Sequence, residues 1–322
     1  MTRLVSNPHT AVKDKYLATN APGSETQQSD LIHPGNITPA HCLPPQPGMR
    51  LHWTGLQGSA DLFAAVELAK QVDELCVIVT NQPAHSDRWR DGIGFFSSTE
   101  ELENLRFPDW ETLPYDAFSP HQDIISERLA TLQTLRSATH GVLTVPVSTL
   151  MQKMPPLSYL DGACFELVCG ETFDVANQRL ILESAGYQSV ETVTERGQYA
   201  VRGALMDVYP MGAPLPVRID LLDDEIDTLR TFDPDSQRTV DRIERMSLLP
   251  AKEFPFDDPA IARFRDRWHD EFQVDVRQCS VYQDVSSYIA PNGVEYYLPL
   301  FFDKLATLFD YLPENAIFLT ED

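Results

Sequence analysis

The chain has 322 residues and a formal net charge of −23 at pH 7. This length predicts two or three domains and enough buried surface that no disulfide or metal is needed for stability. The charge argues against a self-sufficient nucleic-acid binder, because affinity for a phosphate backbone comes mainly from lysine and arginine. The five cysteines are odd in number and scattered, which indicates neither a disulfide framework nor a metal site.

The N-terminal region, residues 1–50, is rich in proline and has no sustained apolar periodicity. These features predict an irregular leader, either disordered or laid over the surface. The first residues lack the apolar core of a secretory signal, and no apolar run is long enough to span a bilayer. We therefore expect a cytoplasmic protein with no membrane contact.

Helical and strand patterns alternate through residues 51–160. Apolar residues recur at helical spacing over 61–72, where Asp61 is placed to cap the helix. Residues 75–79 and 141–147 are continuous apolar runs, typical of strands buried on both faces. Further helices are predicted at 99–105, 122–135 and 149–151, and a turn at Gly92 and Gly94. This order predicts a mainly parallel sheet with helices on its faces.

The pattern changes near residue 161. A strand is predicted at 165–168 and an amphipathic helix at 175–185, ended by Gly186. Alternating apolar and polar stretches then follow, separated by turn residues, as in antiparallel strands. These stretches are 190–194, 199–201, 205–209, 217–222, 226–232 and 239–243. Residues 161–250 therefore predict a small α+β domain.

Residues 251–322 return to the earlier pattern. A helix is predicted at 258–272, a short helix or turn at 282–287, a strand or buried loop at 296–302, a short element at 308–312 and a core strand at 316–319. The chain stops directly after that last strand. Because a domain rarely ends on a buried strand, we expect this chain to be a piece of a longer protein.

A glycine-containing turn precedes the first helix. Gly58, Ser59 and Ala60 stand where a working P-loop needs a glycine, a lysine and a serine or threonine. The residues alone leave two interpretations open, an ordinary turn or a nucleotide loop that has lost its charge and its metal ligand. They do not predict a functional ATP site.

Two groups of polar residues also invite a catalytic interpretation. Glu321 and Asp322 follow an apolar strand, as a Walker B acid does, but two terminal acids are also typical of a solvated chain end. Ser119, His121 and Asp123 lie within five residues, whereas a catalytic triad is assembled from distant segments. A solvated loop, with Ser119 or Asp123 as helix cap, is the better interpretation. No catalytic residue is predicted.

Two arginines stand out in the small acidic domain. Arg202 and Arg218 lie in strand-like runs, and alternation places Arg218, Asp220 and Leu222 on one strand face. Arginine beside an apolar residue is typical of a protein-interface hot spot. The alternative is a solvated sheet face with salt bridges to the acids at 223–225.

Four long motifs carry a family resemblance. They are Trp-Glu-Thr-Leu-Pro-Tyr-Asp-Ala-Phe-Ser-Pro-His-Gln-Asp-Ile-Ile-Ser-Glu-Arg-Leu-Ala-Thr-Leu at 110–132, Arg-Gly-Ala-Leu-Met-Asp-Val-Tyr-Pro-Met-Gly at 202–212, Asp-Asp-Glu-Ile-Asp with Phe-Asp-Pro-Asp-Ser-Gln-Arg-Thr at 223–239, and Gly-Val-Glu-Tyr-Tyr-Leu-Pro-Leu-Phe-Phe at 293–302. Over residues 50–322 the chain resembles the N-terminal UvrB-homology region of bacterial transcription-repair coupling factors (Mfd).

The resemblance implies an α/β fold in which a degenerate RecA-like, UvrB-like parallel-sheet domain is split by a small α+β UvrA-binding domain. The expected divisions are a leader at 1–50, domain 1a at 51–160, domain 2 at 161–250 and domain 1b at 251–322. Gly58, Ser59 and Ala60 then resemble a decayed P-loop, and Glu321 and Asp322 a vestigial Walker B site. The segment 114–123 has no room for the long DNA-inserting hairpin of UvrB.

By the same resemblance, the UvrA contact uses Arg202, Arg218 and Leu222, where relatives often have phenylalanine at the last position. The implied function is an adaptor that recruits UvrA in transcription-coupled nucleotide excision repair, with no cofactor and no ATPase or helicase activity of its own. The parent protein is expected to be an ATP-dependent DNA translocase whose other regions bind RNA polymerase and DNA and whose C-terminal part masks the UvrA surface. The alternatives are a nucleotide-dependent UvrB- or helicase-type enzyme and a DNA-damage binder.

Overall fold

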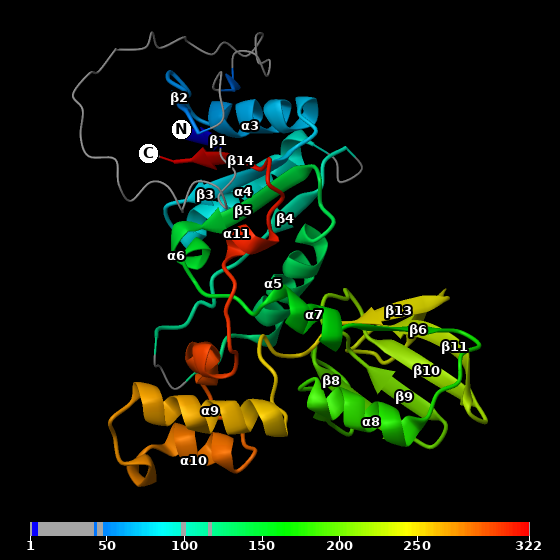
Figure 1. Cartoon of the computed structure of the whole chain (residues 1–322). Coiled ribbons are helices and arrows are strands. Elements are labelled where there is room, and N and C mark those ends of the chain that lie inside the picture. The colour runs from blue at the N-terminus through cyan, green and yellow to red at the C-terminus, as the bar shows by residue number, and fades with distance from the viewer. Residues whose placement is uncertain (1, 6–41, 44–47, 98–100, 115–117, 322) are drawn as a thin grey trace. The chain divides into compact units, whose positions relative to one another are not determined.

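Four parallel strands form the centre of the first folded unit (Figure 1). The computed structural model describes residues 2–5, 42–43, 48–97, 101–114 and 118–321. The parallel strands lie in the order β14 (Ile317–Thr320), β3 (Leu75–Thr80), β5 (Gly141–Pro146) and β4 (Asn104–Arg106). Every residue of β3 and β5 is buried, which is why these two strands read as continuous apolar runs.

Two antiparallel strands extend this sheet beyond β14. They are β1 (Thr2–Val5), which pairs with β14, and β2 (Arg50–His52), which pairs with β1. The prediction of an irregular leader is therefore wrong at residues 2–5. Residues 6–41 and 44–47 lie outside the described part of the chain, and the prediction stays untested there.

Helices pack on this sheet, and one of them was not predicted. The helices of the unit include α3 (Ala60–Gln71), α4 (Pro83–Phe96), α6 (Val147–Leu150) and α11 (Leu308–Tyr311). Gly92 and Gly94 lie inside α4 and not in the predicted turn. A Cβ at Gly92 would come within 2.6 Å of Leu62 of α3, so glycine here permits the close approach of two helices although it weakens the helix itself.

Another prediction failed beside α4. The short helix expected at 99–105 is absent at its C-terminal end, because residues 104–106 form the edge strand β4 and pair with β5. Residues 98–100 lie outside the described part of the chain.

A separate six-stranded sheet dominates the second unit, in the order β12-β11-β10-β9-β8-β7. All neighbours are antiparallel except β7 and β8. The strands are β7 (Gln188–Ser189), β8 (Gln198–Arg202), β9 (Leu205–Val208), β10 (Val217–Leu222), β11 (Glu225–Phe232) and β12 (Thr239–Ile243). Five of the six predicted alternating stretches are strands. The sixth, 190–194, is not a strand. The short strand β7 lies just before it, at Gln188 and Ser189, and pairs with β8.

Helix α8 (Val175–Ser184) lies along one face of this sheet (Figure 1). Tyr199 of β8 donates its hydroxyl hydrogen to Glu183 at 2.6 Å, which marks the helix-covered face. Asp174 caps the helix start and Gly186, at φ 87°, follows its end as predicted. A small two-stranded sheet, β6 (Phe165–Val168) with β13 (Arg245–Leu248), completes this part of the unit.

Further helices belong to the second unit. They are α7 (Leu157–Ala163), α9 (Asp258–Glu271), η2 (Val276–Gln278), α10 (Ser280–Ser286) and η3 (Val294–Leu300). The segment η3, for which a strand or a buried loop was expected, is a 3₁₀ helix whose Pro299 has no N–H for a sheet ladder. Its neighbours Phe264, Trp268 and Phe301 form an aromatic core.

A buried ion pair lies within the second unit, next to the Trp110 motif. Arg128, from helix α5 (Gln122–Leu135), donates from Nε to Glu253 Oε1 at 2.7 Å, and both side chains are at most 1% exposed. Trp110 Nε1 donates to the other oxygen of Glu253 at 2.8 Å, and its ring lies under the Arg128 guanidinium. Both oxygens of the buried carboxylate are therefore satisfied.

The predicted fold class, a helix-covered parallel sheet with a separate, largely antiparallel sheet, is confirmed. The first unit comprises residues 1–109, 131–152 and 307–322, and the second comprises 110–130 and 153–306. The finer division at residues 50, 160 and 250 stays a prediction. None of the described helices combines the length and the apolar character needed to cross a bilayer.

Candidate functional site

Arg202 and Arg218 converge on one buried carboxylate. Asp207 of β9 lies directly opposite Arg218 of β10 in the sheet register. Arg218 donates from Nε to Asp207 Oδ1 at 2.7 Å and from Nη2 to Oδ2 at 2.9 Å. Arg202, at the end of β8, donates from Nη2 to the same Oδ2. We call these three side chains the Arg202–Asp207–Arg218 cluster.

The cluster holds its guanidinium groups in fixed positions. The Asp207 side chain is fully buried, the Arg218 side chain is 17% exposed and the Arg202 side chain is 48% exposed. Hydrogen bonding to Asp207 raises the pKa of Arg218 and outweighs the opposing effect of burial. The Phe232 ring lies 4.7 Å beneath the Arg218 guanidinium. Two positive charges share one negative charge, so the cluster presents a net positive, oriented surface.

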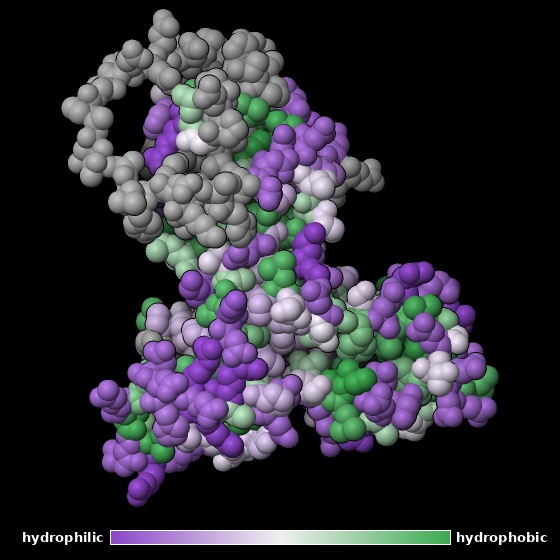
Figure 2. Space-filling model, viewed as in Figure 1, coloured by the Kyte–Doolittle hydropathy of each residue, from purple (hydrophilic) through white to green (hydrophobic). Residues whose placement is uncertain are grey.

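Leu222 lies on the same sheet face as this cluster. It ends β10, opposite Glu225 of β11, and is 67% exposed. Strand alternation from Arg218 through Asp220 reaches Leu222, and this face is opposite the one that α8 covers. The structure therefore brings the three predicted residues onto one sheet face. Figure 2 shows hydrophobic and hydrophilic groups intermixed over the part of the surface that carries β8–β11.

Sequence reasoning missed Asp207. The interpretation that the arginines form salt bridges looked for acids at 223–225, next to the strand end, whereas the acid that Arg218 contacts lies on the neighbouring strand. The available signal was the spacing within 202–212, because a tight turn at Gly203, with φ 62°, folds β9 back beside β8 and brings Asp207 to Arg202. The position of Arg218 opposite Asp207 needed the register of a third strand.

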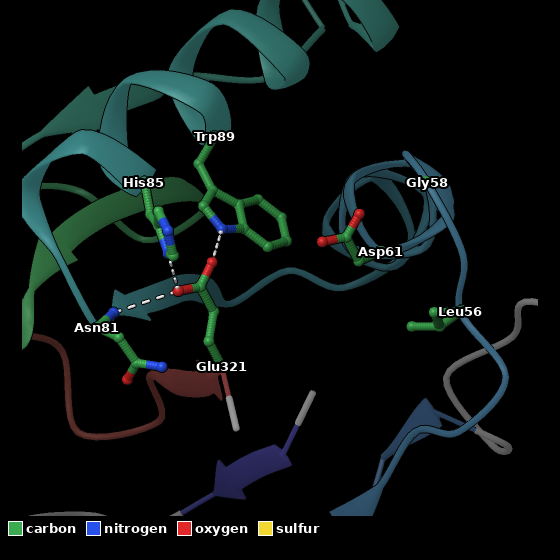
Figure 3. Close-up of a pocket in the computed structure, with 7 residues that line it drawn as sticks. All are labelled: Leu56, Gly58, Asp61, Asn81, His85, Trp89 and Glu321. Carbon is green, nitrogen blue, oxygen red and sulfur yellow. Dashed lines mark hydrogen bonds and ion pairs between the residues drawn. The ribbon is translucent and has the colours of Figure 1, made fainter.

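Gly58, from the segment predicted to be a decayed P-loop, and Glu321 line one pocket in the first unit (Figure 3). The pocket has a volume of about 330 Å³ and is lined by Leu56, Gly58, Asp61, Asn81, His85, Trp89 and Glu321. Gly58 adopts φ 63°, a conformation that favours glycine. Ser59 is the N-cap residue of α3 but makes no side-chain capping hydrogen bond, and Ala60 begins the helix.

The charged side chains beside this loop are already paired with other groups of the protein. Arg88 of α4 forms two hydrogen bonds of 2.9 Å with the carboxylate of Asp61, and a third of 3.0 Å with the carbonyl of Gly58. Asp61 is not the N-cap residue of α3, but its carboxylate accepts the first-turn backbone N–H of Leu62 at 2.8 Å and also pairs with Arg88. The prediction that Asp61 caps the helix start is therefore right for the hydrogen bond and wrong for the N-cap position. The guanidinium that could attract a phosphate is bound to a carboxylate.

Glu321 is also fully engaged. It accepts hydrogen bonds from Trp89 Nε1 at 2.8 Å and from the backbone N–H of Asn81 at 3.2 Å, and its Oε2 lies 2.8 Å from His85 Nδ1. Burial opposes ionisation, but these hydrogen bonds outweigh it and lower the pKa of Glu321. Asp322 lies outside the described residues. The residues that line the pocket include no lysine, the side chain that a working P-loop places against the β- and γ-phosphates.

Replacing Glu321 with glutamine is expected to reduce the dependence of the free energy of unfolding on pH at acidic pH. A folded-state pKa below the unfolded value of about 4.3 means that Glu321 stabilises the fold above that pH, and that this contribution is lost as the pH falls through the folded pKa. Chemical denaturation between pH 3 and pH 7 measures this. The same pH dependence in the variant and the wild type would show that the three hydrogen bonds do not stabilise the ionised carboxylate over the protonated one.

Ser119, His121 and Asp123 do not form a hydrogen-bonded triad. His121 Nδ1 lies 3.4 Å from Asp123 Oδ2, but Ser119 donates to Glu295 at 2.9 Å and Asp123 also pairs with Arg196. The backbone N–H of Asp123 donates to His121 Nδ1 at 3.2 Å. The prediction that Ser119 or Asp123 caps α5 is therefore wrong, because His121 accepts that N–H. Among the described residues no group of acids, histidines and cysteines has the geometry of a metal site.

Comparisons with known proteins agree with this architecture. Residues 165–254 match the model of the UvrB interaction domain. The chain is 45% identical over 278 residues to the transcription-repair-coupling factors of Haemophilus influenzae and Escherichia coli, and 32% identical over 291 residues to that of Myxococcus xanthus. These alignments cover 86%, 86% and 85% of this chain but 24% of each relative.

The segment that matches the UvrB interaction domain contains the six-stranded sheet, and with it the Arg202–Asp207–Arg218 cluster and Leu222. The chain spans about a quarter of the length of the relatives that it matches. It belongs to the transcription-repair-coupling factor family and corresponds to the N-terminal, UvrB-like portion of those proteins.

Proposed function

We propose that this chain is an adaptor that binds UvrA and recruits it for transcription-coupled nucleotide excision repair. The observation that supports this most strongly is the Arg202–Asp207–Arg218 cluster, which fixes two guanidinium groups within the segment that matches the UvrB interaction domain. Holding the donors in place before binding reduces the conformational entropy lost on association.

The chemistry of the site fits a protein partner. Each guanidinium offers a planar set of donors that suits a carboxylate. Leu222, 67% exposed on the same face and four residues along β10 from Arg218, provides an apolar contact. An oriented arginine beside an apolar contact is typical of an interface hot spot, and an acidic chain of net charge −23 favours this partner class over DNA.

Replacing Leu222 with alanine is expected to weaken UvrA binding about five- to tenfold, corresponding to roughly 1–1.4 kcal/mol for one apolar interface contact. Leu222→Phe is expected to bind at least as tightly, because a ring buries more apolar area. Leu180→Ala is the matched control, since Leu180 of α8 is 66% exposed. Equal losses for the two alanine variants would remove Leu222 from the site.

We further propose that the chain neither binds nor hydrolyses ATP. The pairing of Arg88 with Asp61 and the saturation of Glu321 support this. A titration with magnesium ATP is expected to give no saturable signal, and saturable binding that Arg88→Ala abolishes would contradict the proposal.

We also propose activities for the longer protein, which would depend on regions outside the matched portion. These are ATP-dependent DNA translocation, contacts with RNA polymerase and DNA, and masking of the UvrA surface by the C-terminal part.

A further inference from the structure

The Arg202–Asp207–Arg218 cluster is the start of a longer charged row. In the sheet register Asp207 of β9 lies opposite Arg218 of β10, Arg218 lies opposite Arg230 of β11, and Arg230 lies opposite Arg242 of β12. Residues directly opposite each other point to the same face of a sheet. At about 4.8 Å between strands, the row from Asp207 to Arg242 spans about 14 Å.

The next arginine of the row is also held by an acid. Arg230 donates from Nε and Nη2 to Asp220 Oδ2, the first at 2.9 Å, and Thr228 donates to the same oxygen at 2.8 Å. The side chains of Arg230 and Asp220 are 30% and 20% exposed, whereas those of Arg218 and Asp207 are 17% and 0% exposed. Asp220 therefore orients Arg230, through one oxygen where Asp207 uses two.

The outer member is different. Arg242 is exposed on the edge strand, and within the described part of the chain no carboxylate oxygen is recorded within 4 Å of it. Like charges directly opposite on neighbouring strands destabilise a sheet. Arg242 opposite Arg230 therefore costs stability in the free chain, and an external carboxylate would relieve that cost.

We propose that the UvrA-binding surface continues along this row, so that Arg230 and Arg242 bind an acidic segment of the partner beside the residues that contact Arg202 and Arg218. This inference rests on the proposed function. Charge complementarity and continuity with the Arg202–Asp207–Arg218 cluster support a carboxylate-bearing protein segment.

Arg242 is the position at which to test the proposal, because its side chain is exposed and its loss leaves no buried acid unpaired. In the whole chain, Arg242→Glu is expected to weaken UvrA binding about five- to thirtyfold and to reduce the salt dependence of the affinity. The melting temperature is expected to stay unchanged or to rise, because Arg230 gains an acid opposite it. Arg242→Gln is expected to lie between Arg242→Glu and the wild type.

The control is Arg245→Glu. Arg245 is 70% exposed on β13 of the two-stranded sheet, and this variant is expected to bind UvrA like the wild type. If Arg242→Glu binds UvrA within twofold of the wild type while Arg218→Ala does not, the UvrA-binding surface ends at the cluster and Arg242 only protects a sheet edge. That result would overturn this inference and leave the proposed function standing. Loss of affinity for duplex DNA instead of UvrA would also overturn it. Absence of UvrA binding by the wild type would overturn the proposed function as well.

Discussion

Replacement of Arg218 with alanine is expected to weaken UvrA binding by about 2–5 kcal/mol, which corresponds to roughly thirtyfold or more. The physical reason is that Arg218 holds both oxygens of Asp207. Its removal deletes one oriented guanidinium from the interface and leaves a fully buried carboxylate to Arg202 alone. Titration of the variant with UvrA, by calorimetry or fluorescence anisotropy, measures the loss.

Two further variants separate binding from folding. Arg202→Ala is expected to lose less affinity than Arg218→Ala and to unfold at nearly the wild-type temperature, because the Arg202 side chain is 48% exposed and Arg218 still holds Asp207. Arg245→Ala, on the other sheet, is the surface control. Wild-type affinity in the double variant of Arg202 and Arg218 would remove the cluster from the UvrA site.

Replacement of Arg128 with methionine is expected to lower the free energy of unfolding by about 3–5 kcal/mol, because breaking a buried ion pair leaves its partner charge without compensation. Arg128 and Glu253 are 0% and 1% exposed, and Arg128 also covers the Trp110 ring. Denaturant unfolding followed by tryptophan fluorescence measures the change.

The matched control for this second prediction is Arg245→Met, which removes an exposed pair with Glu166 at 3.6 Å and is expected to change stability by about 0–1 kcal/mol. Arg128→Met combined with Glu253→Met is expected to recover part of the loss, because the pair is then replaced by apolar groups of similar size. A loss below about 1 kcal/mol in the single variant would show that solvent reaches Glu253 on small structural adjustment.

The sequence predicted much of the sheet face that carries the site, because a strand period of two is visible in residues 217–222 and 226–232 and places Arg218 and Leu222 together. It did not predict Asp207 as the shared acid, because register across three strands depends on turns and bulges. The shift between Asp220 and Leu221 is one such irregularity. Nor did it predict α4, where Gly92 reads as a turn but serves helix packing.

The pocket lined by Gly58 and Glu321 shows the same limit. The missing lysine at Ser59 and the acid after a core strand were visible in the sequence. His85 and Trp89, which line the pocket, and Arg88 beside it come from a helix that has no nucleotide motif. Their contacts with Glu321 and Asp61 join residues that are far apart in the sequence. Only the fold brings them together.

The most direct test of UvrA binding through the Arg202–Asp207–Arg218 cluster is an equilibrium titration of the wild-type chain with purified UvrA, with Arg202→Ala/Arg218→Ala and Arg245→Ala titrated in parallel. Saturable binding is expected for the wild type and for Arg245→Ala, with a loss of about thirtyfold or more in the double variant. Absence of saturable binding by the correctly folded wild-type chain, or equal affinity in all three proteins, would contradict this role of the cluster.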